Sequence, residues 1–129
     1  MKKVLFLCTG NSCRSQMAEG FMKQYEGYEA FSAGTKPAEK VNPNAITVMK
    51  EVGIDLTSHT PKLVDEYLNE QFDYVITVCD SAKETCPVFT GKVKNHLHIG
   101  FEDPDGHSLE KFREVRDLIS KAVEELRHK

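Results

Sequence analysis

Hydrophobic positions along the chain follow two alternating patterns: short continuous runs, and stripes that recur every three or four residues. The runs are typical of buried strands and the stripes of amphipathic helices. Strands are therefore predicted at Val4 to Leu7, Glu29 to Ala33, Tyr74 to Val78 and His96 to Ile99. Helices are predicted from Gln16 to Tyr25, from Pro43 to Val52, after Thr60-Pro61, and from Leu109 to Leu126.

Residues at the ends of these segments support the helix predictions. Asn42 is typical of a helix cap, proline follows it at the first helical position, and Gly53 can end the same helix. In the helix after Thr60-Pro61 the inward residues would be Leu63, Val64, Tyr67 and Leu68. The core face of the last helix would consist of Phe112, Val115, Leu118, Ile119, Ala122, Val123 and Leu126.

Strands that alternate with helices indicate an α/β fold with a parallel sheet. We expect one domain over residues 1–129, built as a four-stranded parallel sheet with helices on both faces. In such a sheet, ligands bind beyond the carboxyl ends of the strands. Cys8 ends the first predicted strand, Cys79 ends the third, and Asp103 lies just after the fourth. The fold therefore predicts that these three residues meet at one edge of the sheet.

Composition and charge narrow the possible functions. With 129 residues and 40% apolar content, the chain can bury a core of its own. The net charge is −3 and the basic residues are scattered, so nucleic acid is not an expected partner. No apolar run is long enough for a secretory signal or a membrane span. We expect a soluble, cytoplasmic monomer, and in that reducing compartment four cysteines favour catalytic, redox or metal chemistry.

The segment between the first strand and the first helix has the features of an anion-binding loop. Its sequence, CTGNSCRS, runs from Cys8 to Ser15. Loop N–H groups and the positive end of the helix dipole can surround one oxyanion, and Arg14 can bind two of its oxygens. These donors would keep Cys8 as the nucleophilic thiolate, while Ser15 could cap the helix or donate to the sulfur. The predicted oxyanion site consists of Thr9, Gly10, Asn11, Ser12, Cys13, Arg14 and Ser15.

Three further candidate residues lie later in the chain. Cys79 and Cys86 are seven positions apart in a polar segment. Their spacing fits a pair of redox thiols, but it also fits two unrelated thiols, because no C-x2-C signature is present. Asp103 precedes a proline, and this arrangement is compatible with a solvated turn as well as with an acid in a site.

The string CTGNSCRSQMAEG, which begins at Cys8, resembles the low-molecular-weight protein tyrosine phosphatase superfamily and, within it, the thioredoxin-coupled arsenate reductases. The resemblance continues through FSAG (31–34), NPNAITVMKEVGIDL (42–56), VITVCDSAKETCP (75–87) and GFEDP (100–104). It therefore covers most of the chain, and it implies the low-molecular-weight phosphatase fold.

The resemblance also implies a reaction, the reduction of arsenate to arsenite by a relay of three cysteines. Cys8 would attack arsenate while Asp103 acts as the general acid, Cys79 would then attack Cys8, and Cys86 would attack Cys79. The implied reductant is thioredoxin, phosphate and sulfate would compete with arsenate, and a weak phosphatase side activity is expected. No cofactor and no resident metal are expected.

Two other functions stay open. A protein tyrosine phosphatase of this fold would hydrolyse phosphomonoesters through a phosphocysteine at Cys8, with Arg14 and Asp103 as its only other catalytic residues. Against it, Thr9 and Ser12 are more polar than those phosphatases tend to have, and no tyrosine pair flanks Asp103. A zinc or redox-sensing module ranks last, because the cysteines lack paired C-x2-C spacing.

Four residues near these motifs are expected to have structural roles. Cys13 should pack in the loop rather than join the relay, and Asn11 should shape the loop through side-chain bonds to the backbone. His96 and His98 share one face of a predicted strand, so a metal pair is conceivable there. With no third ligand evident, an ordinary half-buried strand is the favoured interpretation.

The chain departs from the resembled family at one position. Some members hold a potassium ion with residues that match Asn11, Glu19 and Ser32, together with an aspartate where this chain has Lys62. An ammonium group at that place should disfavour a bound cation and could supply its charge. We therefore expect no potassium requirement.

Overall fold

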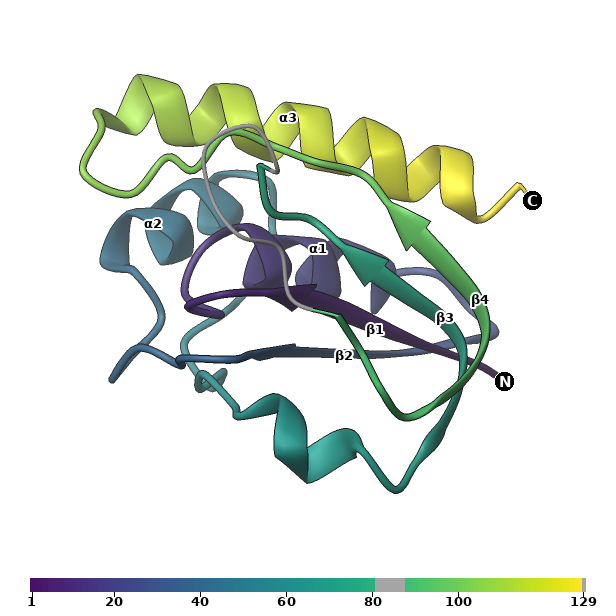
Figure 1. Ribbon diagram of the computed structural model, residues 1–129. Helices are drawn as coiled ribbons and strands as arrows, with labels where there is room; N and C mark the ends of the chain where they lie inside the picture. The colour runs from purple at the N-terminus through teal and green to yellow at the C-terminus, as the bar shows by residue number, and fades with distance from the viewer. Residues whose placement is uncertain (81–87, 129) are drawn as a thin grey trace.

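The computed structural model describes residues 1–80 and 88–128 and contains one parallel sheet (Figure 1). Its strands are β1 (Lys2–Cys8), β2 (Tyr28–Gly34), β3 (Gln71–Thr77) and β4 (Lys92–His98). The order across the sheet is β2-β1-β3-β4, and every neighbouring pair is parallel. The predicted four-stranded parallel sheet is confirmed. The β1 strand lies inside the sheet, so its carboxyl end is flanked by β2 and β3.

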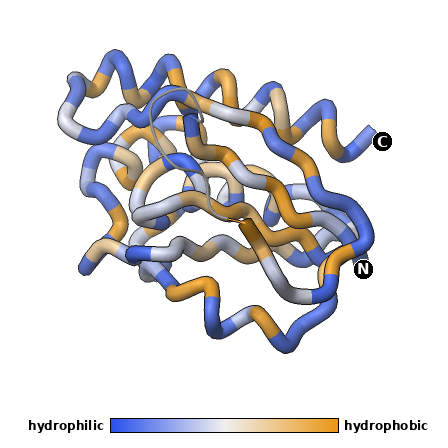
Figure 2. The backbone as a smooth tube through the Cα atoms, in the orientation of Figure 1, coloured by the Kyte–Doolittle hydropathy of each residue, from blue (hydrophilic) through white to orange (hydrophobic). Residues whose placement is uncertain are grey.

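Alternation along β1 divides the core between the two faces of the sheet. Val4 and Phe6 belong to a cluster shared with the helices α1 (Arg14–Met22), α2 (Pro43–Glu51) and α3 (Leu109–Leu126). Leu5 and Leu7 belong to a second cluster, shared with the short 3-10 helix η1 (Val64–Tyr67). Both faces are therefore covered, with α1, α2 and α3 on one face and η1 on the other. In Figure 2 the central strands are correspondingly the most hydrophobic part of the tube.

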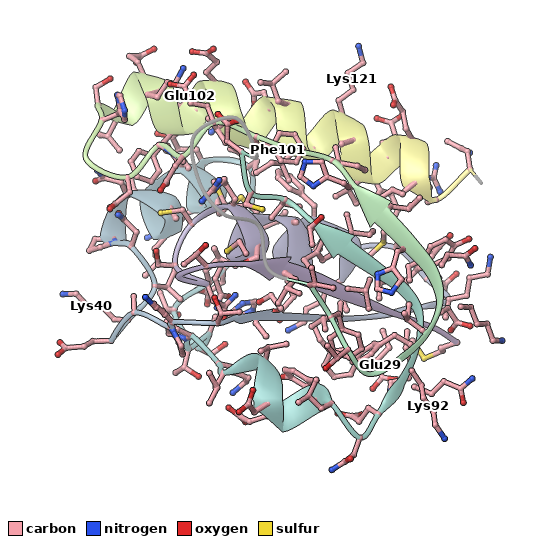
Figure 3. The ribbon with its side chains drawn as sticks, viewed as in Figure 1. Glu29, Lys40, Lys92, Phe101, Glu102 and Lys121 are labelled. Atoms are coloured by element: carbon pink, nitrogen blue, oxygen red, sulfur yellow. The ribbon has the colours of Figure 1, made fainter. Side chains whose placement is uncertain are left out.

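The bounds of α3 agree with the sequence prediction because the signals there are local. The Ser108 side chain accepts from the N–H of Lys111 at 3.4 Å and caps the helix. Phe112, Ile119 and Val123 are buried against the sheet. Leu118, predicted to lie on the core face, is 52% exposed, so the apolar stripe is narrower than expected. Lys121 extends from α3 away from the sheet (Figure 3).

The helix predicted after Thr60-Pro61 is wrong in extent. Only the single 3-10 turn of η1 forms, and Leu63, predicted to point inward, is 38% exposed. The reason is a parallel bridge between Leu63 and Gly34, which holds Leu63 in an extended conformation at the end of β2. A helix cannot begin until that pairing ends.

The first helix is also shorter than predicted, ending at Met22 rather than Tyr25. Beyond Met22 the backbone bonds of Gln24 and Tyr25 reach back three residues, which is typical of turns. Gly27 then has φ of +86°, which favours glycine and directs the chain into β2. Among the described residues, no helix is both long and apolar enough to cross a membrane.

Candidate active site

The loop between β1 and α1 forms one wall of a pocket of about 490 Å³ at the carboxyl edge of the sheet. Cys8 is the last residue of β1 and is buried, and α1 begins directly after the loop, at Arg14. Residues from the loop, from the segment before α2 and from the segment after β4 line the pocket: Cys8, Thr9, Gly10, Asn11, Ser12, Cys13, Arg14, Ala38, Asp103 and Asp105. The predicted loop and Asp103 are therefore brought together.

Carbonyl groups of the loop are hydrogen-bonded to the segment between β2 and α2. Those of Thr9, Gly10 and Ser12 accept hydrogen bonds from the N–H groups of Lys36 (3.0 Å), Ala38 (2.9 Å) and Asn42 (3.0 Å), respectively. In a trans peptide the N–H group points opposite to the carbonyl group. The N–H groups that follow these carbonyls therefore point away from that segment, and the one on Asn11 donates to Cys8 Sγ, beside the positive end of the α1 dipole.

Two groups hold the sulfur of Cys8. The hydroxyl of Ser15 lies 2.9 Å from Sγ, and the N–H of Asn11 donates to it at 3.3 Å. The prediction that Ser15 hydrogen-bonds to Cys8 is confirmed, whereas the alternative, helix capping, is not: the cap residue is Cys13, which makes no side-chain cap bond. Cys8 thus has donors in place before an anion arrives.

Asn11 organises the loop, as predicted. Its φ is +51°, a left-handed conformation that asparagine tolerates better than most residues. Its Oδ1 accepts from the N–H of Lys62 at 2.8 Å, and its Nδ2 donates to Ser15 Oγ at 2.7 Å. One buried side chain therefore ties the loop to a distant segment and to the partner of Cys8.

Gln16 and His59 extend this arrangement, and neither is among the site residues predicted from the sequence. Gln16 Nε2 lies 3.2 Å from both Asn11 Oδ1 and the Asn11 carbonyl oxygen, and its Oε1 lies 2.9 Å from His59 Nδ1. The sequence did contain one indication for Gln16, since it is a polar residue in the first turn of a helix that is otherwise expected to be buried. For His59 no local signal exists, because its partners are tens of residues away.

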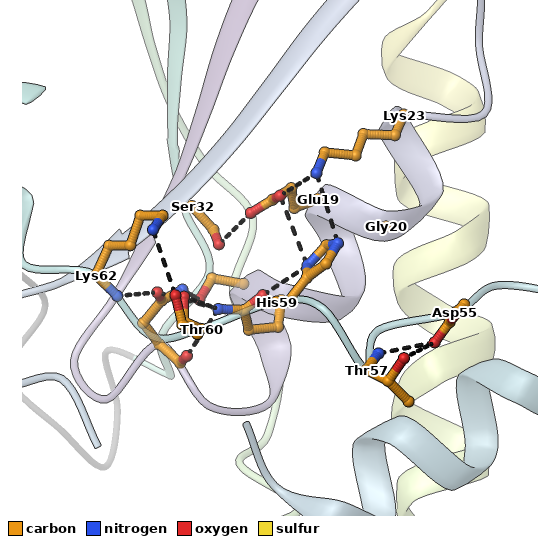
Figure 4. A network of polar contacts seen from close by, with 12 residues as sticks. Glu19, Gly20, Lys23, Ser32, Asp55, Thr57, His59, Thr60 and Lys62 are labelled. Atoms are coloured by element: carbon orange, nitrogen blue, oxygen red, sulfur yellow. Dashed lines mark hydrogen bonds and ion pairs between the residues drawn. The ribbon is translucent and has the colours of Figure 1, made fainter. Parts of the chain in front are cut away.

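The residues matched to a potassium site do not form an open cation site. Glu19 accepts from Ser32 Oγ at 2.5 Å, and its Oε2 lies 2.7 Å from Lys23 Nζ (Figure 4). Nζ of Lys62 lies 3.3 Å from Thr60 Oγ1. Lys23, rather than the Lys62 considered from the sequence, supplies the counter-charge to Glu19. A potassium ion would have to compete with this ammonium group.

Arg14 and Asp103 face each other across the pocket. Arg14 is only 4% exposed, and its Nη1 donates to the Phe101 carbonyl at 3.1 Å. Its Nη2 lies 3.6 Å from Asp103 Oδ2. The segment that carries Asp103 is also held by Glu102, which pairs with Lys111 at 3.0 Å beside α3 (Figure 3). A cation and an acid are thus held at the mouth of the pocket that the loop lines.

Cys13 is buried beside the pocket, and its environment disfavours ionisation. Burial is the largest cause that raises the pKa of its thiol, and the nearby carboxylates of Asp103 and Asp105 raise it further, to about 12. It is therefore a neutral thiol at physiological pH, which agrees with the packing role predicted for it.

Cys79 is fully buried just after β3, and its sulfur is in a disulfide, while Cys8 and Cys13 are free thiols. The N–H of Val78 donates to the Leu7 carbonyl at 3.0 Å, so the segment holding Cys79 runs directly beside the end of β1. The predicted convergence of Cys8, Cys79 and Asp103 at one edge is confirmed for the backbone. Cys86 lies outside the described residues.

The two strand histidines do not gather metal ligands. Both His96 and His98 are exposed on β4, and His98 Nδ1 lies 2.7 Å from Thr77 Oγ1. Over residues 1–80 and 88–128, no group of three histidine, cysteine or acidic side chains could hold a metal ion.

Comparison with known proteins links this site to one family. The model for the family "Low molecular weight phosphotyrosine protein phosphatase" matches residues 3–129. Arsenate reductase 2 of Staphylococcus epidermidis is 47% identical over 125 residues, which cover 95% of this chain and 94% of that protein. A solved structure described as an arsenate reductase in the phosphate binding state has a TM-score of 0.85 at 40% identity, covering 98% of this chain and 96% of its own. A thioredoxin-dependent arsenate reductase of Corynebacterium glutamicum has a TM-score of 0.68 at 28% identity, covering 98% of this chain and 60% of its own.

Proposed function

This chain belongs to the low molecular weight phosphotyrosine protein phosphatase family, and we propose that its reaction, the reduction of arsenate to arsenite, is carried out by three cysteines. These are Cys8, Cys79 and Cys86. The observation that carries this assignment is the pocket itself. A free buried thiol lies 2.9 Å from a hydroxyl donor, under a loop whose carbonyls are hydrogen-bonded to the segment between β2 and α2. Arg14 and Asp103 complete a site for a small tetrahedral anion.

In the first step the Cys8 thiolate attacks the arsenic atom of bound arsenate. Arg14 and the loop N–H groups bind the remaining oxygens, where negative charge accumulates. Asp103 donates a proton to the departing oxygen, which leaves as water. The product is a covalent bond between Cys8 Sγ and arsenic, which is still in the +5 state.

In the second step the thiolate of Cys79 attacks Sγ of Cys8. The sulfur–arsenic bond breaks, its electron pair stays on arsenic, and arsenite leaves with arsenic in the +3 state. Cys86 then attacks Cys79 and releases Cys8 as a thiolate, so the disulfide joins Cys79 and Cys86. The state of the described cysteines, with Cys79 in a disulfide and Cys8 free, agrees with the end of this sequence.

The second step brings Cys79 Sγ to Cys8 Sγ. The register pairs Leu7 with Thr77, which places Val78 rather than Cys79 level with Cys8. Cys79 lies beyond the end of β3, so strand pairing does not hold the two sulfurs together, and the relay needs the backbone at Cys79 to carry its sulfur to Cys8.

Two electrons must be returned to the enzyme after each cycle. A thioredoxin is the proposed donor, supported by the similarity to a thioredoxin-dependent arsenate reductase. A thioredoxin-type dithiol exchanges readily with a protein disulfide, and the reducing cytoplasm is the compartment in which we place a monomeric enzyme.

Phosphate ester hydrolysis is the less favoured function for this pocket. No aromatic side chain is among the described residues that line it, so an aryl phosphate would have no ring to stack on. The same nucleophile and acid would still support a weak side activity on such esters.

Single-turnover experiments test the proposed function. The fully reduced protein is mixed with one equivalent of arsenate, and arsenite and the resulting disulfide are measured, the latter by peptide mapping. We expect one arsenite per chain and a disulfide between Cys79 and Cys86. The variant Cys79→Ser should still release phosphate slowly from an aryl phosphate but lose repeated turnover of arsenate. If that variant kept full arsenate turnover with a thioredoxin, the relay would be wrong.

A further inference from the structure

Asn42 connects three separate parts of the molecule. As the cap of α2, its Oδ1 accepts from the N–H of Asn44 at 2.9 Å. Its own N–H donates to the carbonyl of Ser12 in the anion loop at 3.0 Å. Its Nδ2 donates to Asp105 Oδ1 at 2.9 Å. The first bond is an ordinary helix cap, whereas the other two join the anion loop to the segment that carries Asp103.

Asp105 also contacts Asp103, the proposed acid. Its N–H donates to Asp103 Oδ1 at 3.0 Å, and Oδ2 of Asp103 lies 3.6 Å from Arg14 Nη2. Both aspartates line the pocket. The contacts therefore close a ring around the pocket mouth, from the anion loop through Asn42, Asp105 and Asp103 back to Arg14.

We propose that the bond between Asn42 and Asp105 is a clasp that positions the Asp103 carboxyl over the anion loop, which makes Asn42 a positioning residue for the protonation step. The inference rests on the proposed function, since it concerns the acid of that reaction. The acid segment is otherwise anchored beside α3, through Glu102 and Lys111, and near β4, through Phe101 and Arg14. The clasp holds it from the pocket side.

The strength of this hydrogen bond and its position near the acid both support the proposed role of Asn42. A hydrogen bond to a carboxylate is stronger than one between neutral groups. A general acid must lie within hydrogen-bond reach of the oxygen that it protonates, so a small displacement of its segment lowers the rate. Gly106, with φ of +81°, directly follows Asp105 in a turn that the His107 N–H closes by donating to the Pro104 carbonyl at 2.9 Å.

The variant Asn42→Asp disrupts the clasp and keeps the helix cap. Aspartate caps a helix as well as asparagine does, so α2 keeps its cap. The new carboxylate would face Asp105 and repel it. In the double variant Asn42→Asp with Asp105→Asn, the new amide at position 105 can donate to the new carboxylate at position 42, and the clasp is restored with reversed polarity. Asn44→Asp is the matched control, because it adds the same charge in the first turn of the same helix, at a side chain that takes no part in the contacts described above.

The rate of single-turnover arsenite formation is measured first. Asn42→Asp should lower it about three- to tenfold, while Asn44→Asp and the double variant stay within about twofold of the parent. The second measurement is kcat/KM for phenyl phosphate and for p-nitrophenyl phosphate. Phenolate is the poorer leaving group and depends more on the acid, so Asn42→Asp should lower kcat/KM for phenyl phosphate more. Thermal unfolding should shift by only about a few degrees, because a single exposed hydrogen bond is lost.

Three results would overturn the clasp while leaving the proposed function intact. These are an unchanged rate in Asn42→Asp, a loss that the double variant does not restore, or an equal loss for both phosphate esters. Failure of the proposed function would look different, since the unmodified protein would then form no arsenite in a single turnover.

Discussion

The side-chain amide of Asn11 donates to the hydroxyl of Ser15 at 2.7 Å, and the sulfur of Cys8 lies 2.9 Å from the same oxygen. The Cys8 thiolate that attacks in the proposed mechanism can only accept a hydrogen bond, so Ser15 donates to it while Asn11 holds the hydroxyl oxygen in place. Ser15 therefore acts as a directed donor to the sulfur. The pair is buried, so water cannot take over its role.

Removing this hydroxyl should make Cys8 less reactive. A hydrogen bond to a charged group contributes about 1.5–3 kcal/mol, so Ser15→Ala should slow the reaction of Cys8 with an electrophile about tenfold. The measurement is the rate of alkylation of Cys8 by iodoacetamide in the reduced protein, with the modified site mapped by mass spectrometry. Ser108→Ala, which removes a hydroxyl at the distant α3 cap, is the control. Equal rates in the two variants would contradict the role of Ser15.

His59 belongs to the same hydrogen-bond network, which it joins through Gln16. Gln16 uses its Nε2 as the donor to Asn11, so its Oε1 must accept from His59 Nδ1, 2.9 Å away. The other ring nitrogen, Nε2, lies 3.5 Å from the Lys23 ammonium group. The network therefore assigns a neutral ring with its hydrogen on Nδ1.

Folding stability should fall when His59 is forced to charge. Burial is the largest cause that lowers the pKa of His59 below its usual 6.5; the charges of Lys23 and Lys62 also lower it, while those of Glu19 and Asp55 oppose the shift. A histidine with a lowered pKa contributes full stability above about pH 6.5 and loses it as the pH falls through the folded-state pKa. Urea unfolding at pH 7.5 and 5.5 should show a smaller decrease in His59→Gln than in the parent, whereas His107→Gln should match the parent. A parent-like decrease in His59→Gln would refute the assignment.

Position 34 requires glycine because the loop between β1 and α1 passes close to it. A Cβ atom at this position would lie 2.3 Å from the Thr9 carbonyl oxygen and 3.1 Å from the Asn11 nitrogen, both of them backbone atoms. Gly34→Ala should therefore displace the loop and weaken sulfate binding more than tenfold, with a stability loss of about 1–3 kcal/mol. Isothermal titration with sulfate and urea unfolding measure the two effects. Normal sulfate affinity in a folded variant would show that the loop tolerates the added atom.

The parts of this site that could be predicted are those with local signals. Cys8, Arg14 and Ser15 follow one apolar strand within a few residues, and the bounds of α3 follow from its cap and its apolar stripe. Three other residues, Gln16, His59 and Asp105, could not be predicted as parts of the site. In the sequence they look like ordinary polar residues, and they contact residues that are distant along the chain. Sequence periodicity also failed where pairing took precedence, since the bridge at Leu63 prevents the helix that its apolar spacing indicates.

Asp103 should matter for turnover rather than for binding. Its Oδ2 lies 3.6 Å from Arg14, so removing the carboxyl deletes the proposed proton donor and also one negative charge near the anion. Asp103→Ala should therefore lower single-turnover arsenite formation about 100-fold, within the range of general acid catalysis, while sulfate binds as tightly as before or more tightly. Quenched-flow kinetics measure the rate, and isothermal titration calorimetry measures sulfate binding. Asp117→Ala, which removes an exposed carboxylate on α3, is the control. Weakened sulfate binding with an unchanged rate constant would mean that Asp103 holds the pocket together instead of supplying the proton.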